Sequence, residues 1–312
     1  MRPLEAHRAR SGAPQARRSR LTEVEAPEFD LQSHSVHSDG ALSAGEVVAA
    51  AAQAGVKLLA VSDHDTVAGI PEAVQAAAAA QIRLVPATEI TAIYAGRQDL
   101  HILGYMIDEL DPTLVGTLER SRSARERRAG AMADALRELG FELDEAALAE
   151  RAAQGSSIGR PHLAQAVVSR PANRQRLDAE GLLDPTAFLV AYLIEGRPAF
   201  RHRAAPTVEE AIELIHGAGG LAVWAHPFWD IKAPREVLDA IERFRRAGLD
   251  GVEAFYVTHT REQTELLVGR CVEDGILSTG SSDFHGPRHH TFSSFRAFDT
   301  YGLAPVLGPL AD

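Results

Sequence analysis

Histidines and acidic residues recur along this chain directly after short apolar segments. The stretch FDLQSHSVHSDG at residues 29–40 places His34, His37 and Asp39 at uneven spacing behind an apolar opening. Side chains of these types bind metal ions when a fold brings several of them to one place. The stretch is therefore either a solvated loop or the first part of a metal site whose other ligands come from elsewhere.

Further candidates follow the later apolar segments. In chain order they are Asp63, His64 and Asp65 in SDHDT, Glu89 after RLVPAT, His101 in LHILGY, His226 in WAHPFW, Glu253 and His259 around EAFYVTH, and Asp283 and His285 in SSDFH. Each residue alone has an ordinary explanation as a turn residue, a helix cap or a core histidine. Their shared position after nearly every apolar segment favours a common site.

The candidate set combines imidazoles and carboxylates and contains no thiolate. This composition suits Mn²⁺, Fe²⁺ or Zn²⁺ and argues against a site for Mg²⁺ alone, which prefers oxygen ligands and water. The candidates are too numerous for one ion. We therefore expect two or three divalent ions with a bridging hydroxide, an arrangement that hydrolyses phosphate esters in many enzymes.

The apolar segments have the length of strands and mostly alternate with helix-like segments. They cover residues 29–32, 57–62, 83–88, 100–105, 220–225, 250–256 and 275–281. Between the third and fourth segments there is room only for a hairpin around Ala95 and Gly96. Alternation of strand and helix predicts an α/β fold with a parallel sheet, and in an α/β barrel the carboxyl ends of the strands form one face, where active sites lie.

Four regions are expected along the chain. Residues 1–27 are predicted to be a disordered basic tail, with a weak electrostatic hold on RNA as the alternative. Residues 28–106 and 206–312 hold the strand-like segments and are predicted to form the two parts of the barrel. Residues 107–205 break the alternation, and we expect them to form a helical insertion between the fourth and fifth strands.

Composition narrows the class of protein further. The chain has 312 residues, a formal net charge of −11 and a single cysteine. Cys271 lies in a helix-like segment and is predicted to be a structural core thiol. No segment has the length and apolarity of a signal peptide or a membrane span, so we expect a cytoplasmic protein without a membrane partner. The negative charge argues against binding long duplex nucleic acid.

Six motifs together resemble one known family. DLQSHSVHSDG, LLAVSDHDT, PATEIT, HILGY, WAHP and STGSSDFHG, in this order, are similar to the motifs of the PHP (polymerase and histidinol phosphatase) family, most closely its small TrpH-like members. SIGRPHLA at residues 157–164 extends the likeness into the insertion. The resemblance implies a distorted (β/α)7 TIM-like barrel with a trinuclear metal centre. It also implies phosphoesterase activity on nucleotides that carry 3′ and 5′ phosphates, or exonuclease activity on the 5′ ends of short oligoribonucleotides.

The resemblance also implies a ligand set. One ion would take His34, Glu89 and Asp283, a second Glu89, His101 and His226, and a third Asp39, His64 and His285. His37 is not expected to be a ligand. The family motif begins His-x-His, and this chain has Gln32 at the first of these positions. An amide oxygen is a weaker, neutral ligand, so the first ion is expected to be loosely held, differently chosen or absent.

Three further residues are predicted to contact the substrate or to take part in its hydrolysis. Asp65 is expected to orient a water or protonate the leaving oxygen, with a helix cap as the alternative. Arg160 precedes Pro161, which suits a first helical turn, so Arg160 is expected at a helix N-terminus where it can bind a second phosphate. His259 lies past a strand end and is expected to touch the substrate. The arginine-rich segment 120–128 is interpreted as a solvated helix face, with guidance of an oligonucleotide as the alternative.

Other functions remain open from the sequence. One is hydrolysis of a non-phosphate bond by an amidohydrolase-like enzyme, and another is a histidinol-phosphatase-like activity. A third is a binding module with a decayed site, which only Gln32 favours. The sequence predicts a small phosphorylated partner, such as a nucleotide or a short oligoribonucleotide, and does not identify it.

Overall fold

The computed structural model describes residues 27–153 and 158–312. Apart from Pro27, the tail predicted for residues 1–27 lies outside the described residues. The elements are, in order, β1 (Phe29–Asp30), α1 (Ala44–Gln53), β2 (Leu58–Val61), α2 (Ile70–Ala80), β3 (Arg83–Tyr94), β4 (Arg97–Tyr105), α3 (Pro112–Glu138), α4 (Glu145–Ala153), α5 (Arg160–Val168), the 3₁₀ helix η1 (Pro171–Asn173), α6 (Arg174–Glu180), α7 (Pro185–Tyr192), α8 (Val208–Gly217), β5 (Leu221–Trp224), α9 (Pro227–Asp230), α10 (Pro234–Arg246), β6 (Gly251–Tyr256), α11 (Arg261–Asp274), β7 (Leu277–Ser281) and the 3₁₀ helix η2 (Gly308–Ala311).

The strands form a nearly closed barrel. Within the described residues the sheet has seven strands, hydrogen-bonded in chain order from β1 to β7. The pairs β1–β2, β2–β3, β5–β6 and β6–β7 are parallel. The sheet edges also approach each other, because Leu31 N donates to Gly280 O at 3.1 Å and His34 N donates to Phe284 O at 2.8 Å. The predicted distorted (β/α)7 fold is confirmed.

β4 is the strand that breaks the parallel pattern. It pairs antiparallel with both β3 and β5. Ala95 and Gly96 join β3 to β4 as predicted, and both adopt positive φ angles, of 49° and 82°. A tight turn of this kind fits a two-residue hairpin. β3 also runs to Tyr94, beyond the predicted segment 83–88, so Glu89 lies inside the strand rather than at its end.

Local sequence signals explain how the barrel helices begin and end. Ser43 caps α1 and forms a capping box with Glu46, and Gly55 follows the helix with φ 81°. The cap satisfies free amide groups in the first turn, and glycine accepts the left-handed conformation that ends the helix. Cys271 is buried in α11, and burial raises the pKa of its thiol to about 12. This setting matches a core thiol.

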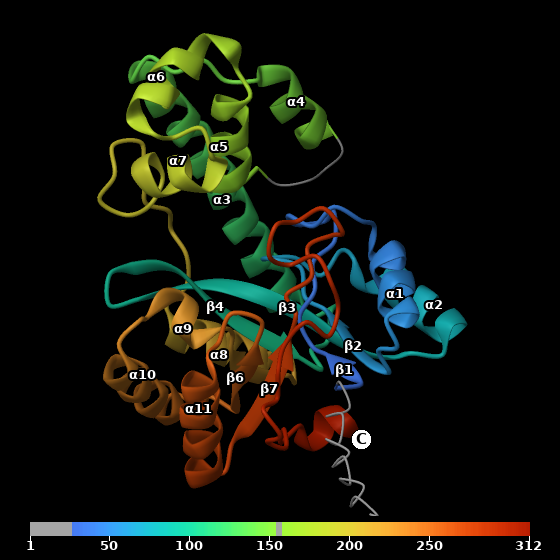
Figure 1. Cartoon of the computed structure of the whole chain (residues 1–312). Helices are drawn as coiled ribbons and strands as arrows, with labels where there is room; N and C mark the ends of the chain where they lie inside the picture. The colour runs from blue at the N-terminus through green and yellow to red at the C-terminus, as the bar shows by residue number, and fades with distance from the viewer. Residues whose placement is uncertain (1–26, 154–157) are drawn as a thin grey trace, which may run out of the picture.

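The helices from α3 to α7 lie between β4 and β5 and have their own apolar core. That core includes Leu136, Leu163, Leu177 and Phe188, each at most 1% exposed. Figure 1 shows these helices standing on one end of the barrel, above the loop between β1 and α1 and the loop after β7. The long α3 connects the barrel with this helical unit. Side chains from the unit can therefore reach the carboxyl ends of the parallel strands.

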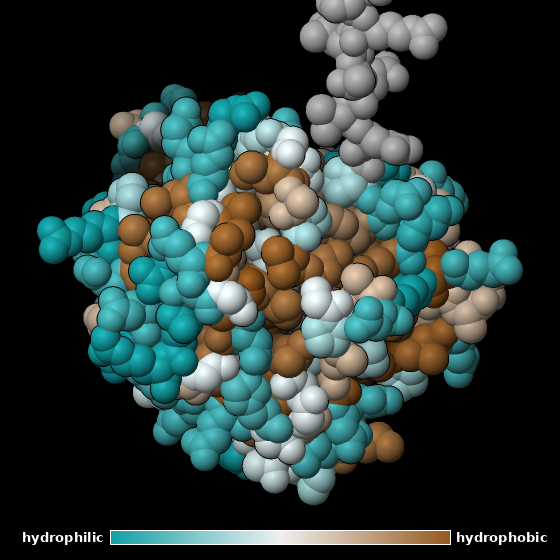
Figure 2. All heavy atoms as spheres, turned by 90° about the horizontal axis from the view of Figure 1, so that it is seen from below, coloured by the Kyte–Doolittle hydropathy of each residue, from teal (hydrophilic) through white to brown (hydrophobic). Residues whose placement is uncertain are grey.

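The opposite end of the barrel looks different. Seen from below, it carries a broad apolar area at its centre, bordered by hydrophilic residues (Figure 2). Among the described residues, no helix is both long and apolar enough to cross a membrane.

Candidate metal centre

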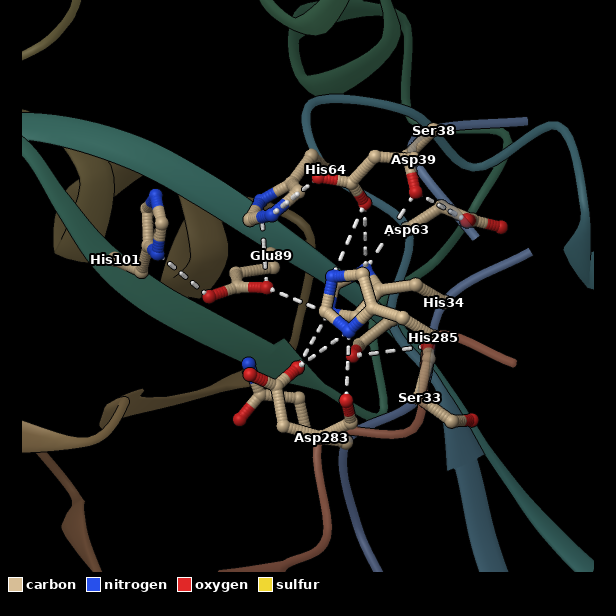
Figure 3. A network of polar contacts seen from close by, with 12 residues as sticks. Ser33, His34, Ser38, Asp39, Asp63, His64, Glu89, His101, Asp283 and His285 are labelled. Atoms are coloured by element: carbon tan, nitrogen blue, oxygen red, sulfur yellow. Dashed lines mark hydrogen bonds and ion pairs between the residues drawn. The ribbon is translucent and has the colours of Figure 1, made fainter. Parts of the chain in front are cut away.

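All eight side chains predicted as metal ligands lie in one network at the carboxyl ends of the parallel strands. They are His34, Asp39, His64, Glu89, His101, His226, Asp283 and His285. Figure 3 shows the contacts around His34, Glu89 and His285. We call these eight residues the cluster. They come from every strand region except β6, so the whole barrel is needed to assemble them.

Glu89 is at the centre of the cluster and faces four imidazoles. Its Oε1 lies 2.9 Å from His101 Nδ1 and 3.3 Å from His226 Nε2. Its Oε2 lies 3.1 Å from His34 Nε2 and 3.3 Å from His64 Nδ1. Each oxygen of Glu89 therefore faces a different pair of imidazoles.

Asp39 forms a second centre of the cluster. Its Oδ1 lies 3.4 Å from His285 Nε2 and 3.8 Å from His34 Nδ1, and its Oδ2 lies 3.6 Å from His64 Nε2. Asp283 Oδ1 lies 3.0 Å from His34 Nε2. His34 therefore contacts both centres of the cluster.

Two groups of potential ligand atoms are compact enough to hold an ion. Within each group, the atoms lie within 4.8 Å of one another. The members are His34, Asp39, His64 and His285 in one group, and His64, Glu89 and His101 in the other. The first group agrees with the third ion implied by the family resemblance, with His34 added. The second group pairs Glu89 and His101 with His64, where the resemblance implied His226.

The hydrogen bonding of the cluster suits side chains that bind cations. Among the described residues, six buried ligand atoms of the cluster lack a partner with good hydrogen-bond geometry: His34 Nε2, Asp39 Oδ1, His64 Nδ1, Glu89 Oε2, His226 Nδ1 and Asp283 Oδ1. Several of these atoms lie close to each other, for example His34 Nε2 and Asp283 Oδ1 at 3.0 Å. Leaving buried polar atoms unsatisfied is costly. Divalent ions between these nitrogen and oxygen atoms would satisfy them.

Two members of the cluster have the charge state that a metal ligand requires. Burial disfavours a charge on Glu89, but contacts with His101 and His226 hold the pKa of its carboxyl well below the usual range. Burial lowers the pKa of His64 to about 3, so its imidazole is neutral at neutral pH. Against the effect of burial, Asp283 and Glu89 raise the pKa of His34, and Glu89 raises that of His226 to about 9. Metal ligands must be deprotonated, so an ion would displace a proton from these two imidazoles on binding.

Residues around the cluster hold its loops in place. Asp63 accepts hydrogen bonds from Ser35 N at 2.7 Å, Ser35 Oγ at 2.6 Å and Ser38 Oγ at 2.6 Å. These bonds fix the loop that carries His34 and Asp39. Asp63 thus supports the site from behind, as outer contacts of metal ligands commonly do.

Two ligand candidates have unusual backbone conformations. His226 and Asp283 adopt φ angles of 32° and 52°, in the left-handed region. Glu253 Oε2 accepts a hydrogen bond from His226 N at 2.9 Å, and Tyr256 Oη donates to Asp283 Oδ2 at 2.8 Å. Glu253 and Tyr256, both on β6, therefore hold the two strained residues. The sequence predicts Glu253 near a strand end without indicating its role, and no local pattern singles out Tyr256.

Gln32 is completely buried beside the cluster. Its Oε1 accepts a hydrogen bond from Ser281 Oγ at 3.3 Å, and its Nε2 has no hydrogen-bond partner. Ser281 Oγ also donates to Glu253 at 2.5 Å. Gln32 is therefore packed where the family motif has a histidine, with one amide group still unsatisfied.

Asp65 does not match the predicted role of a proton donor. Its Oδ2 lies 2.8 Å from Arg125 Nη2 and 3.3 Å from Arg203 Nη1, and Thr91 N donates to its Oδ1 at 2.9 Å. Burial would raise the pKa of Asp65, but the two arginines hold it below its usual value. A carboxylate held ionised in this way anchors guanidinium groups and cannot readily donate a proton.

Arg160 is the first residue of α5, as predicted, and takes part in a basic cluster. We use this name for Arg125, Arg128, Arg160 and Arg203, which share the two carboxylates of Asp65 and Asp99. Four positive groups and two negative groups leave two positive charges in excess. Arg160 Nη2 lies 3.2 Å from Asp99 Oδ2, and the Arg160 side chain is still 31% exposed.

The structure corrects the interpretation of segment 120–128 as a solvated face. The side chains of Arg125 and Arg128 are only 16% and 6% exposed, because they form the ion pairs of the basic cluster. Arg151, on α4, donates to Ser38 O at 3.0 Å. His162, on α5, is near Asp39 and His285, and burial lowers its pKa to about 4. No local sequence pattern indicates these positions of Arg151 and His162.

His259 is close to the cluster but offers little surface to a substrate. It is 5% exposed, and its ring packs 5.3 Å from the ring of Tyr256 and 5.6 Å from that of Phe228. Burial lowers its pKa to about 4. His259 therefore packs against Tyr256 and Phe228, and its contact with substrate stays a prediction.

Comparison with known proteins places this geometry in a family. A PHP domain matches residues 30–152. The chain is 34% identical to a 5′-3′ exoribonuclease of Haemophilus influenzae over 83% of its own length and 90% of the relative. It is 31% identical to a 3′,5′-nucleoside bisphosphate phosphatase of Chromobacterium violaceum over 83% of its own length and 87% of the relative.

A solved structure supports the same relationship. An amidohydrolase from Chromobacterium violaceum, determined with bound sulfate and no metal, superposes with a TM-score of 0.74 and 30% identity, covering 86% of this chain and 91% of the other. The chain belongs to the PHP family, and it is a hydrolase that acts on phosphate esters. The resemblance drawn from the six motifs is confirmed.

Proposed function

We propose that the protein is a phosphoesterase that depends on two or three divalent ions (Mn²⁺, Fe²⁺ or Zn²⁺) bound by the cluster. The observation that carries this proposal is the set of buried imidazole and carboxylate atoms that converge around Glu89 and Asp39 without hydrogen-bond partners. When bound, such ions activate a water as nucleophile and neutralise the phosphoryl oxygens. No serine or cysteine nucleophile is needed.

Side chains of the cluster and of β6 would hold the ions and keep the ligands in position. Glu89 would contribute both of its oxygens as ligands, each beside a different pair of imidazoles. Asp39 would orient His64 and His285 toward a third position. Glu253 and Tyr256 would keep His226 and Asp283 in their strained conformations, so that the ligands are already placed before the substrate arrives.

For the substrate, we propose a nucleotide with phosphates at both the 3′ and 5′ positions. The two excess positive charges of the basic cluster support a second anionic group next to the scissile one. Guanidinium groups bind phosphate oxygens through two parallel hydrogen bonds, which fits this task. In this proposal Arg160 contacts the second phosphate, and residues 107–205 form an insertion that supplies substrate contacts to the barrel.

The 5′ end of a short oligoribonucleotide is a second candidate. It presents a terminal phosphate and a neighbouring phosphodiester, which resemble the two phosphates of a bisphosphonucleotide. The Haemophilus influenzae relative, named a 5′-3′ exoribonuclease, supports this candidate. The formal net charge of −11 favours a short substrate, because a long polyanion is repelled by the rest of the surface.

One experiment tests these proposals together. Release of phosphate or nucleotide is measured with added Mn²⁺ for adenosine 3′,5′-bisphosphate, AMP and a 5′-phosphorylated oligoribonucleotide. Histidinol phosphate and p-nitrophenyl acetate serve as substrates of other classes. We expect Mn²⁺-dependent hydrolysis, fastest for a substrate with two neighbouring phosphates. Equal rates for the bisphosphate and AMP would contradict the substrate proposal. Activity that persists after the metal ions are removed with a chelator would contradict the metal proposal.

A further inference from the structure

Three aromatic side chains form a continuous group beside the cluster. The Trp229 ring centroid lies 5.7 Å from that of Phe292, and Phe292 stacks on His289 with centroids 5.0 Å apart and planes inclined by 24°. We call Trp229, His289 and Phe292 the aromatic wall. They come from α9 and from the loop after β7, two segments far apart in the chain.

The wall is exposed on one side and anchored on the other. Trp229 is 47% exposed, whereas Phe292 behind it is 8% exposed. Lys232 Nζ also lies over the Trp229 ring, 5.8 Å from its centroid. The exposed ring is therefore held by a buried aromatic neighbour and a cation, which limits its conformational freedom. Such a surface suits a planar ligand, because stacking gains contact area without the cost of ordering a flexible side chain.

The wall adjoins ligands of the cluster. Trp229 N donates to the carbonyl of His226 at 2.8 Å, and His285 N donates to the carbonyl of Phe292 at 2.9 Å. The ring centroids of Phe292 and His285 are 5.4 Å apart. The wall is therefore fixed to β5 and β7, while Asp65 and Asp99 tie the basic cluster to the region of β2, β3 and β4.

We propose that the aromatic wall binds the nucleobase of the substrate, with Trp229 as the stacking partner. This inference rests on the proposed function and adds the group that recognises the base, the part of the nucleotide that neither the metal ions nor the basic cluster would bind. The scissile phosphate would lie at the metal ions, the second phosphate at the basic cluster, and the base at the wall. Recognition by stacking tolerates different bases, since every base has a π-face.

Intrinsic fluorescence provides a binding test because the chain has only two tryptophans. Trp224 is completely buried, so the acrylamide-accessible emission comes from Trp229. AMP should protect Trp229 from acrylamide, and ribose 5-phosphate, which lacks the base, should protect it much less. In Trp229→Phe the protected signal should disappear. Equal protection by both compounds, or none by either at concentrations that inhibit hydrolysis, would overturn the proposal.

A kinetic comparison separates this inference from the proposed function. The ratio of kcat/KM for adenosine 3′,5′-bisphosphate to that for ribose 3,5-bisphosphate should fall about five- to a hundredfold in Trp229→Ala, the range typical of one lost stacking contact. Trp229→Phe should restore most of the ratio, and Val272→Ala, an exposed apolar site on α11, serves as control. If the enzyme hydrolyses the bisphosphate and the ratio is unchanged in Trp229→Ala, the proposal that the aromatic wall binds the base is refuted and the proposed function stands. Absence of hydrolysis in the wild type refutes the proposed function.

Discussion

Glu89 Oε2 and His34 Nε2 lie 3.1 Å apart, and both atoms are buried without a hydrogen-bond partner. The two residues come from β3 and from the loop after β1. A carboxylate and an imidazole at this distance form an ion pair when the imidazole is protonated, and they can act as two ligands of one cation when it is neutral. The arrangement is what two ligands of a shared cation require, and it underlies the predictions on the metal centre.

Glu89→Gln should impair metal binding and catalysis together. The amide is neutral and can offer only one oxygen, so it cannot bridge two ions as a carboxylate does. We expect activity to fall by more than the roughly 10–100-fold that loss of an outer contact costs, with a lower ion content by elemental analysis. Glu236→Gln, at an exposed ion pair with Arg97, is the matched control. Full ion content and activity in Glu89→Gln would exclude a bridging role.

Arg160→Ala should selectively weaken hydrolysis of a bisphosphate. Losing a charge-assisted contact costs about 1.5–3 kcal/mol, so kcat/KM for adenosine 3′,5′-bisphosphate should fall roughly ten- to a hundredfold. Hydrolysis of an aryl phosphate, which has no second phosphate, should change far less. Arg170→Ala removes an exposed arginine paired with Glu142 and controls for general charge effects. If both substrates decline equally, Arg160 serves the reacting phosphate or the fold.

Asp65→Asn should lower the free energy of unfolding. Asparagine tolerates the left-handed backbone at this position, where φ is 52°, but it removes the negative charge between Arg125 and Arg203. Breaking a buried ion pair costs about 3–5 kcal/mol, which urea denaturation would measure as a lower free energy of unfolding. Asp134→Asn, at an exposed pair with Arg137, should cost less than about 1 kcal/mol. Equal stability of the two variants would show that Asp65 does not anchor these arginines.

The positions of the candidate ligands could be predicted because they depend on local sequence. A short apolar segment identifies a strand, and the residues that follow a parallel strand must emerge at its carboxyl end. His64, His226 and Asp283 were placed in this way. The short connection at Ala95 and Gly96 likewise required a hairpin, which sets the direction of β4.

The roles of residues outside the strands could not be predicted in the same way. Arginines on α3 have the spacing of a solvated face, and only the packing of the insertion over the barrel turns Arg125 toward Asp65. The orientation of Asp65 depends on its left-handed backbone, which no nearby glycine indicates. Arg151 and His162 reach the site through contacts between distant parts of the chain, and such contacts leave no local pattern.

Gln32→His should tighten the most weakly held ion. An imidazole in place of the amide would add a stronger ligand at a position that is completely buried and has one unsatisfied amide group. The variant should bind more Mn²⁺ at low concentration in a titration followed by calorimetry. Gln53→His, on the exposed end of α1, controls for added histidine. A titration identical to that of the wild type would place Gln32 outside the set of ligands.

The ion content of the purified protein tests the central claim most directly. After the protein is loaded with Mn²⁺ and free metal is removed, elemental analysis should find two or three transition-metal ions per chain. The reason is that the cluster offers side chains for at least two sites. Chelation should abolish phosphate release, and readdition of Mn²⁺ should restore it. Fewer than one ion per chain after loading, in a folded protein that still hydrolyses phosphate esters, would contradict the account.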